Sequence, residues 1–110
     1  MSNLDRISTL LAFTLEEPEN PFNFYALALE YRELDKPKAA YLFDYLLKTF
    51  PNYLPTYFPA AQFFSEEELM DKAKQTLKSG IALASVLKEE KTKRELTNAY
   101  QNLLFETDLE

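Results

Sequence analysis

The chain has 110 residues, which is enough for one domain and too few for two. Hydrophobic residues make up 46% of the chain and aromatic residues 15%, so there is enough apolar surface for a packed core. There is one Gly, one Val and two Ile, so the chain lacks both the β-branched residues of strands and the glycines of turns. The composition therefore predicts a single all-α domain over residues 1–110, with about six helices.

Residues that carry most enzyme chemistry are missing. The chain has no Cys, which excludes disulfides, zinc thiolate sites and Cys nucleophiles, and no His, the usual general base and metal ligand. A single Gly excludes a Gly-rich phosphate loop. The carboxylate clusters at residues 16–19 and 66–68 suit solvated helix ends better than a metal site. We expect no catalysis, no metal, no cofactor and no small-molecule substrate.

The formal charge is −6, which argues against a surface that binds nucleic acid. Residues 72–94 hold seven basic and two acidic residues, a local net charge of +5. This segment lacks interleaved aromatic residues that could stack on bases, so we interpret it as a solvated helix face and turn. No signal peptide is visible and no apolar run approaches a membrane span, so we expect a cytoplasmic protein without membrane contact.

The first predicted helix runs from Leu4 to Leu15, because apolar residues recur at 4, 7, 10, 11 and 15. Either Ser2 or Asn3 could cap it. Pro18 ends this segment, because the residue before a proline avoids the α region.

The second helix is expected from about Pro21 to Leu34, and it is apolar almost all the way round. A turn at Asp35 and Lys36 follows, and a third helix is expected from Pro37 to about Thr49. Pro51 and Asn52 end it.

The fourth helix is expected between about Leu54 and Ser65. Pro59 does not suit a helix interior, so a start near Thr56 is favoured over a kink. The fifth helix covers about Leu69 to Leu87, although a capping box at residues 65–68 would start it earlier, next to Ser65.

Gly80 lies inside the fifth helix, where a glycine often marks the close approach of a neighbouring helix. A turn is expected at residues 88–91. A closing helix follows from about Thr92 to Phe105, and the closing segment as a whole covers residues 92–106.

The spacing contains a repeat. Phe24, Leu27, Ala28 and Tyr31 recur 33 residues later as Tyr57, Ala60, Ala61 and Phe64. Ala39 and Phe43 recur 34 residues later as Ala73 and Leu77. The extra residue falls between paired helices, where a turn can absorb it.

This pattern resembles the tetratricopeptide repeat, in which an aromatic residue, Leu-Gly, Tyr, Ala, Phe and a closing Pro follow at fixed spacings. Ala28 and Ala61 replace the Gly of the pattern, and Ser85 stands where the second closing Pro is expected. The resemblance implies a right-handed α-α superhelix of antiparallel helix hairpins, like that of small bacterial adaptors. It divides the chain into a half-repeat at residues 4–18, repeats at 21–53 and 54–87, and the closing helix.

In tetratricopeptide proteins one face of the repeat-opening helices lines a groove that receives peptides. The residues of that face in this chain are mostly apolar and aromatic: Phe22, Tyr25, Leu29, Arg32, Phe58 and Gln62. The opposing interpretation is that the closing helix folds over this face and buries it. Lys and Asn are absent from these positions, so the resemblance does not extend to the type that clamps a C-terminal carboxylate.

The sequence thus predicts a non-catalytic module that binds a protein or peptide on this face, with Arg32 orienting an acidic group. The alternative is a structural homodimer in which a second copy occupies the same aromatic face. The sequence identifies neither the partner nor the oligomeric state.

Overall fold

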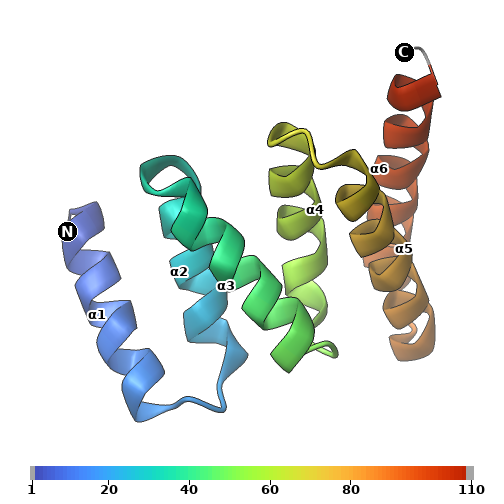
Figure 1. The fold of residues 1–110 in the computed structure, drawn as a ribbon. Coiled ribbons are helices and arrows are strands. Elements are labelled where there is room, and N and C mark those ends of the chain that lie inside the picture. The colour runs from blue at the N-terminus through green and yellow to red at the C-terminus, as the bar shows by residue number, and fades with distance from the viewer. Residues whose placement is uncertain (1, 109–110) are drawn as a thin grey trace. The chain divides into compact units, whose positions relative to one another are not determined.

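The computed structural model describes residues 2–108, which form six α-helices and one short 3₁₀ helix, without a strand (Figure 1). The elements are α1 (Asn3–Glu16), α2 (Pro21–Leu34), α3 (Lys36–Thr49), η1 (Leu54–Thr56), α4 (Tyr57–Glu66), α5 (Met70–Leu87) and α6 (Glu90–Asp108). The all-α prediction is confirmed. The chain divides into two compact units, the first ending at Tyr53 and the second beginning at Leu54. The predicted division into one domain with two repeats stays a prediction.

In the first unit, α1 packs on α2 and α2 packs on α3. Each helix starts at a polar cap: the side chains of Ser2, Asn20 and Asp35 each accept a hydrogen bond from a backbone N–H in the first turn. Pro21 and Pro37 occupy the first turns of α2 and α3, where the missing N–H costs nothing. The predicted bounds of α2 are confirmed, and α3 begins one residue earlier than predicted.

Asp35 alone connects α2 to α3. Its backbone N–H donates to the Tyr31 carbonyl and thereby closes α2, while its side chain accepts from the Lys38 N–H and thereby opens α3. Across the other helix pair of this unit, Arg6 of α1 donates to Glu30 of α2 with 2.8 Å between Nε and Oε1. The Glu30 carboxylate raises the pKa of the Arg6 guanidinium through this hydrogen bond and its charge.

The core of the first unit alternates small and large side chains, as the repeat pattern predicts. Ala28 and Ala39 are fully buried on the facing helices α2 and α3, and they let the two backbones approach. Leu27, Phe43 and Leu46 fill the space around them.

The second unit begins with η1, and α4 follows directly at Tyr57. Pro59 is therefore the third residue of α4, within the first turn, where no backbone N–H has an intrahelical partner. The predicted late start of α4 is confirmed. Thr56 precedes the helix but makes no side-chain cap, and its buried hydroxyl has no hydrogen-bond partner among residues 2–108.

The connection between α4 and α5 corrects one interpretation. The capping box at residues 65–68 is wrong, because Ser65 and Glu66 are the last residues of α4. The α5 helix begins at Met70, close to the alternative start at Leu69. Glu68 adopts a left-handed backbone with φ 62°, and the Leu69 N–H donates to the Phe64 carbonyl, which ends α4 in a Schellman motif.

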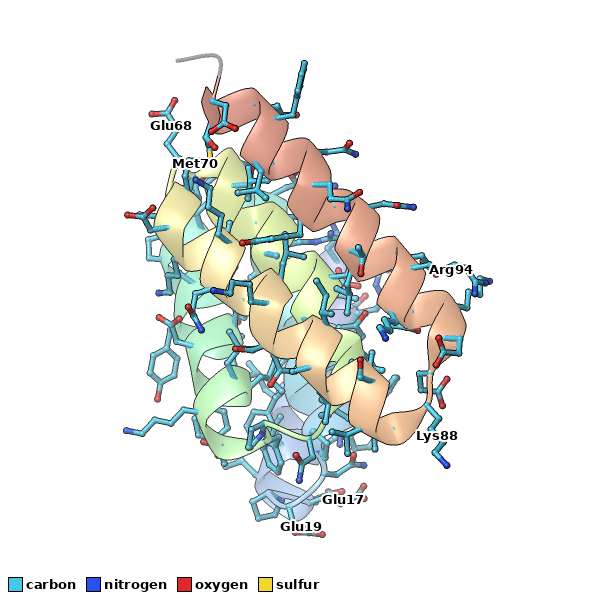
Figure 2. All side chains as sticks on the ribbon, turned by 90° about the vertical axis from the view of Figure 1, so that its right-hand side faces the viewer. Glu17, Glu19, Glu68, Met70, Lys88 and Arg94 are labelled. Carbon is cyan, nitrogen blue, oxygen red and sulfur yellow. The ribbon has the colours of Figure 1, made fainter. Side chains whose placement is uncertain are left out.

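The connection between α5 and α6 has the same geometry. Lys88 has φ 60°, its N–H donates to the Ser85 carbonyl, and the Glu89 N–H donates to the Ala84 carbonyl. Figure 2 shows Glu68 and Lys88 at opposite ends of α5. Because this turn takes two residues rather than the four predicted, α6 starts at Glu90 and extends to Asp108, beyond the predicted limits of 92–106 on both sides.

In the second unit, α5 packs against both α4 and α6. Gly80 of α5 is buried at this junction. A Cβ atom added there would lie 2.8 Å from Cβ of Tyr57 on α4 and 3.1 Å from Cδ1 of Leu96 on α6. The predicted close approach at Gly80 is confirmed, and it joins three helices rather than two.

Candidate functional site

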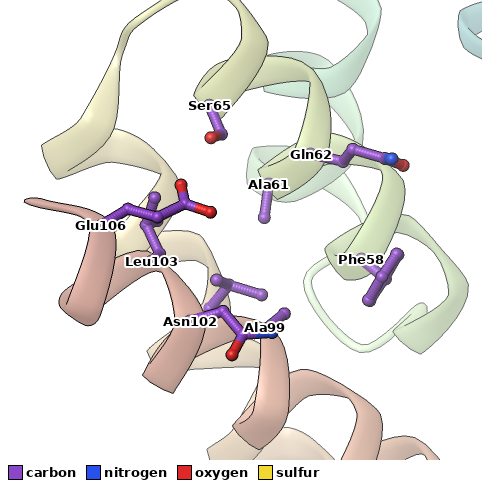
Figure 3. A pocket seen from close by; sticks show the side chains of 9 residues that line it. Phe58, Ala61, Gln62, Ser65, Ala99, Asn102, Leu103 and Glu106 are labelled. Atoms are coloured by element: carbon purple, nitrogen blue, oxygen red, sulfur yellow. The ribbon is translucent and has the colours of Figure 1, made fainter.

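A pocket of about 210 Å³ opens in the second unit between α4 and α6 (Figure 3). Both helices pack on α5, which closes the bottom of the pocket with Leu77. The wall on α4 is formed by Phe58, Ala61, Gln62 and Ser65, and the wall on α6 by Ala99, Asn102, Leu103 and Glu106.

The two walls share one spacing. On each helix the lining residues stand at i, i+3, i+4 and i+7, which places them on a single face of an α-helix. Each stripe contains one alanine, Ala61 as the second residue on α4 and Ala99 as the first on α6, and these small side chains leave the space that the pocket occupies. The pocket is thus a consequence of two helix faces that meet across α5 with small side chains between them.

The chemistry of the pocket changes from its floor to its rim. Ala61, Leu77 and Leu103 are buried and apolar, so the floor suits an aliphatic side chain. Gln62, Asn102 and Glu106 are exposed at the rim and offer hydrogen-bond donors and acceptors. Figure 3 shows the Glu106 carboxylate extending from α6 toward α4. The lining residues include no Lys or Arg.

Two of the predicted site residues, Phe58 and Gln62, line this pocket. Phe58 is 42% exposed, so the closing helix does not bury this part of the predicted face. Instead, α6 packs on α5 and supplies the opposite wall of the pocket. The interpretation in which the closing helix covers Phe58 is wrong, because α6 stands beside α4 rather than over it.

The other predicted residues lie on α2, in the first unit. Phe22 is 54% exposed, while Tyr25, Leu29 and Arg32 are half-buried. Arg32 Nε donates to the Leu29 carbonyl at 3.3 Å, which holds the guanidinium along its own helix. The prediction that these four residues bind a partner together with Phe58 and Gln62 stays a prediction.

The Tyr25 ring contacts Tyr53 edge-on, with the ring centroids 5.8 Å apart and the planes at 71°. Burial raises the pKa of the Tyr53 hydroxyl, and the neighbouring Tyr25 raises it further. Tyr25 is therefore anchored within its own unit and presents only part of its ring to solvent.

The basic segment is spread over α5, the following turn and the start of α6. Lys72 lies with Nζ 4.6 Å from the centroid of the Phe64 ring, and Arg94 projects from α6 (Figure 2). Within residues 2–108, no group of three or more Asp and Glu side chains is placed to hold a metal ion. In the same range, no helix has the length and apolarity needed to cross a membrane.

The residues of the α6 wall were not among the predicted site residues. Their signal was present, because residues 99, 102, 103 and 106 follow helical spacing, but the polar Asn102 and Glu106 hid the stripe. Ala61, which stands at the Gly position of the repeat pattern, and Ser65, which was expected in a capping box, both line the pocket.

Comparisons with known proteins agree with the fold. No family model and no curated protein matches the sequence. A tetratricopeptide repeat domain protein from Salinibacter ruber, solved by solution NMR, is 33% identical, and the match covers 78% of this chain and 88% of that chain with a TM-score of 0.73. A crystal structure of the tetratricopeptide repeat domain protein from this organism matches with 30% identity, 76% and 96% coverage and a TM-score of 0.72.

The chain belongs to the tetratricopeptide repeat family. The predicted resemblance is confirmed. A tetratricopeptide repeat protein is a helical repeat module, and this fold generally serves as a non-enzymatic scaffold for protein interactions.

Proposed function

We propose that the chain is a non-catalytic interaction module that binds a peptide segment of a partner protein in the pocket between α4 and α6. The observation that carries the proposal is an apolar floor next to an exposed aromatic ring, Phe58, with polar side chains around them. An exposed apolar surface rimmed by polar residues is typical of a protein interaction site.

Phe58 supplies the anchor of this interaction. Aromatic side chains dominate binding hot spots because they bury a large area and lose little conformational entropy. The aliphatic side chain of a partner would enter between Ala61 and Leu103, and the rim amides of Gln62 and Asn102 would bond the peptide backbone. On α2 of the first unit, the exposed Phe22 and the half-buried Tyr25, Leu29 and Arg32 form a second surface for contact with a protein or peptide.

Self-association is the second candidate. It is favoured by the exposure of Phe22 and Phe58, two aromatic side chains that a second copy of the chain could cover.

The first experiment fills the pocket. We expect Ala61→Leu to weaken the binding of peptides selected from a random 12-residue display library by about tenfold or more, because the larger side chain occupies the floor. The measurement is fluorescence polarisation with synthetic, labelled versions of the selected peptides. Phe58→Ala should weaken the same peptides, with a moderate loss of stability because the residue is 42% exposed and the rest of its surface is buried.

The matched control is Ala82→Leu, which adds the same volume at an exposed position of α5 outside the pocket. It should leave peptide affinity unchanged. The proposal fails if the library yields no binding peptide, or if the selected peptides bind Ala61→Leu as tightly as they bind the wild type.

A further inference from the structure

We propose that the segment bound in the α4–α6 pocket carries a basic residue beside its aliphatic anchor, and that Glu106 receives this residue. The inference rests on the proposed function, since it names the chemistry of the partner for the same pocket. It differs from the expectation based on Arg32, which favoured an acidic partner group.

The residues that line the pocket carry one negative charge and no positive charge. Glu106 is the one charged side chain among the residues that line the pocket in the described chain. Within residues 2–108 its carboxylate has no ion-pair partner, so it is available to a ligand. A Lys or Arg of a bound peptide would gain a charge-assisted hydrogen bond there, whereas an Asp or Glu would meet a like charge.

The helices α4 and α6 run in the same direction along the two walls of the pocket. Ser65 and Glu106, which line one end of the pocket, lie one turn or less from the C-terminal ends of α4 and α6. Figures 1 and 3 show the two helices ending on the same side. Helix C-termini carry partial negative charge, so the dipoles of α4 and α6 favour a cation at this end of the pocket, and the N-terminus of α5 at Met70 opposes them.

On α6, the apolar floor of the pocket lies within one helical turn of the Glu106 carboxylate. Leu103 of the floor and Glu106 are three residues apart and lie on one helix face. A peptide whose aliphatic side chain sits on Leu103 therefore places a neighbouring residue at Glu106. Charge complementarity at this position distinguishes the expected partner from a purely apolar segment.

The test uses the full chain and a set of fluorescein-labelled nonapeptides with Leu at the centre. Each peptide carries Lys, Gln or Glu at one other position, in a background of Ala and Ser. We expect Lys at one position near the Leu to tighten binding about three- to tenfold over Gln, and Glu there to weaken it. The preference should decrease as the salt concentration rises.

The variants assign the effect to the carboxylate. Glu106→Gln should abolish the preference for Lys, and Glu106→Lys should reverse it in favour of Glu. Glu95→Gln is the matched control, because it removes the same charge from an exposed position of α6 outside the pocket. It should preserve the preference.

Two failures can be told apart. If Leu peptides bind and Ala61→Leu blocks them, but Lys, Gln and Glu peptides bind equally, the inference is overturned and the proposed function stands. If no Leu peptide binds, or if Ala61→Leu makes no difference to those that do, both the inference and the proposed function are overturned.

Discussion

Gly80 is a residue at which three helices of the second unit meet. It lies inside α5, where a glycine costs about 1 kcal/mol relative to alanine, so helix propensity alone favours its replacement. The structure explains its presence, because a Cβ atom would meet Tyr57 at 2.8 Å and Leu96 at 3.1 Å. The sequence could indicate a close approach here, but only the structure identifies the two side chains involved.

We expect Gly80→Ala to lower the free energy of unfolding by up to about 2 kcal/mol, because overpacking, which typically costs about 1–3 kcal/mol, exceeds the gain in helix propensity. Thermal unfolding followed by circular dichroism measures the change. Ser79→Ala is the control, since its exposed side chain makes no such contact and the substitution should be neutral or slightly stabilising. A higher midpoint for Gly80→Ala would mean that Tyr57 can move aside.

At the scale of the element, sequence and structure agree best where a helix begins at proline. Pro21 and Pro37 follow the capping residues Asn20 and Asp35 closely, and these starts were predicted to within one residue. Helix starts carry specific side-chain signals, which explains this accuracy. Pro59 gave the start of α4 by the same reasoning.

Helix ends were harder to predict, because the chain closes α4 and α5 without glycine. Glu68 and Lys88 adopt the left-handed backbone that usually signals a glycine, and the chain's single Gly is used at position 80. Residues 65–68 match the sequence pattern of a capping box, which is typical of a helix start, but they lie at the end of α4. The α6 wall of the pocket was not predicted because its stripe contains the polar Asn102 and Glu106.

We expect Glu68→Gly to raise the free energy of unfolding by about 0.5–1.5 kcal/mol, because it removes the strain of a Cβ atom at positive φ. Glu68 lies between the C-terminus of α4 and the N-terminus of α5, so its charge has opposite effects on the two dipoles. Glu68→Gln, which keeps the Cβ atom, should therefore be close to neutral. Chemical denaturation measures both variants, and a loss of stability for Glu68→Gly would contradict the assignment of strain.

At the scale of the whole molecule, the net charge of −6 bears on which partner the exposed aromatic side chains meet. The residues up to 53 include five basic and eight acidic ones, and the rest include seven and ten, so each part carries a net charge of −3. Two copies of the chain therefore repel one another, whereas a partner with basic residues is attracted. Among the charged residues already counted, the pocket is lined by Glu106 and by no basic residue.

We expect the chain to sediment as a monomer of 12.8 kDa at concentrations from about 1 to 100 μM at physiological salt, because this repulsion opposes the burial of Phe58 by a second copy. A stable homodimer usually buries about 800 Å² on each partner, so its interface would extend well beyond the single exposed ring of Phe58. Sedimentation equilibrium over this range is the measurement, repeated at high salt to screen the charges. A dimer at low micromolar concentration that Phe58→Ala dissociates would instead establish self-association as the role of this face.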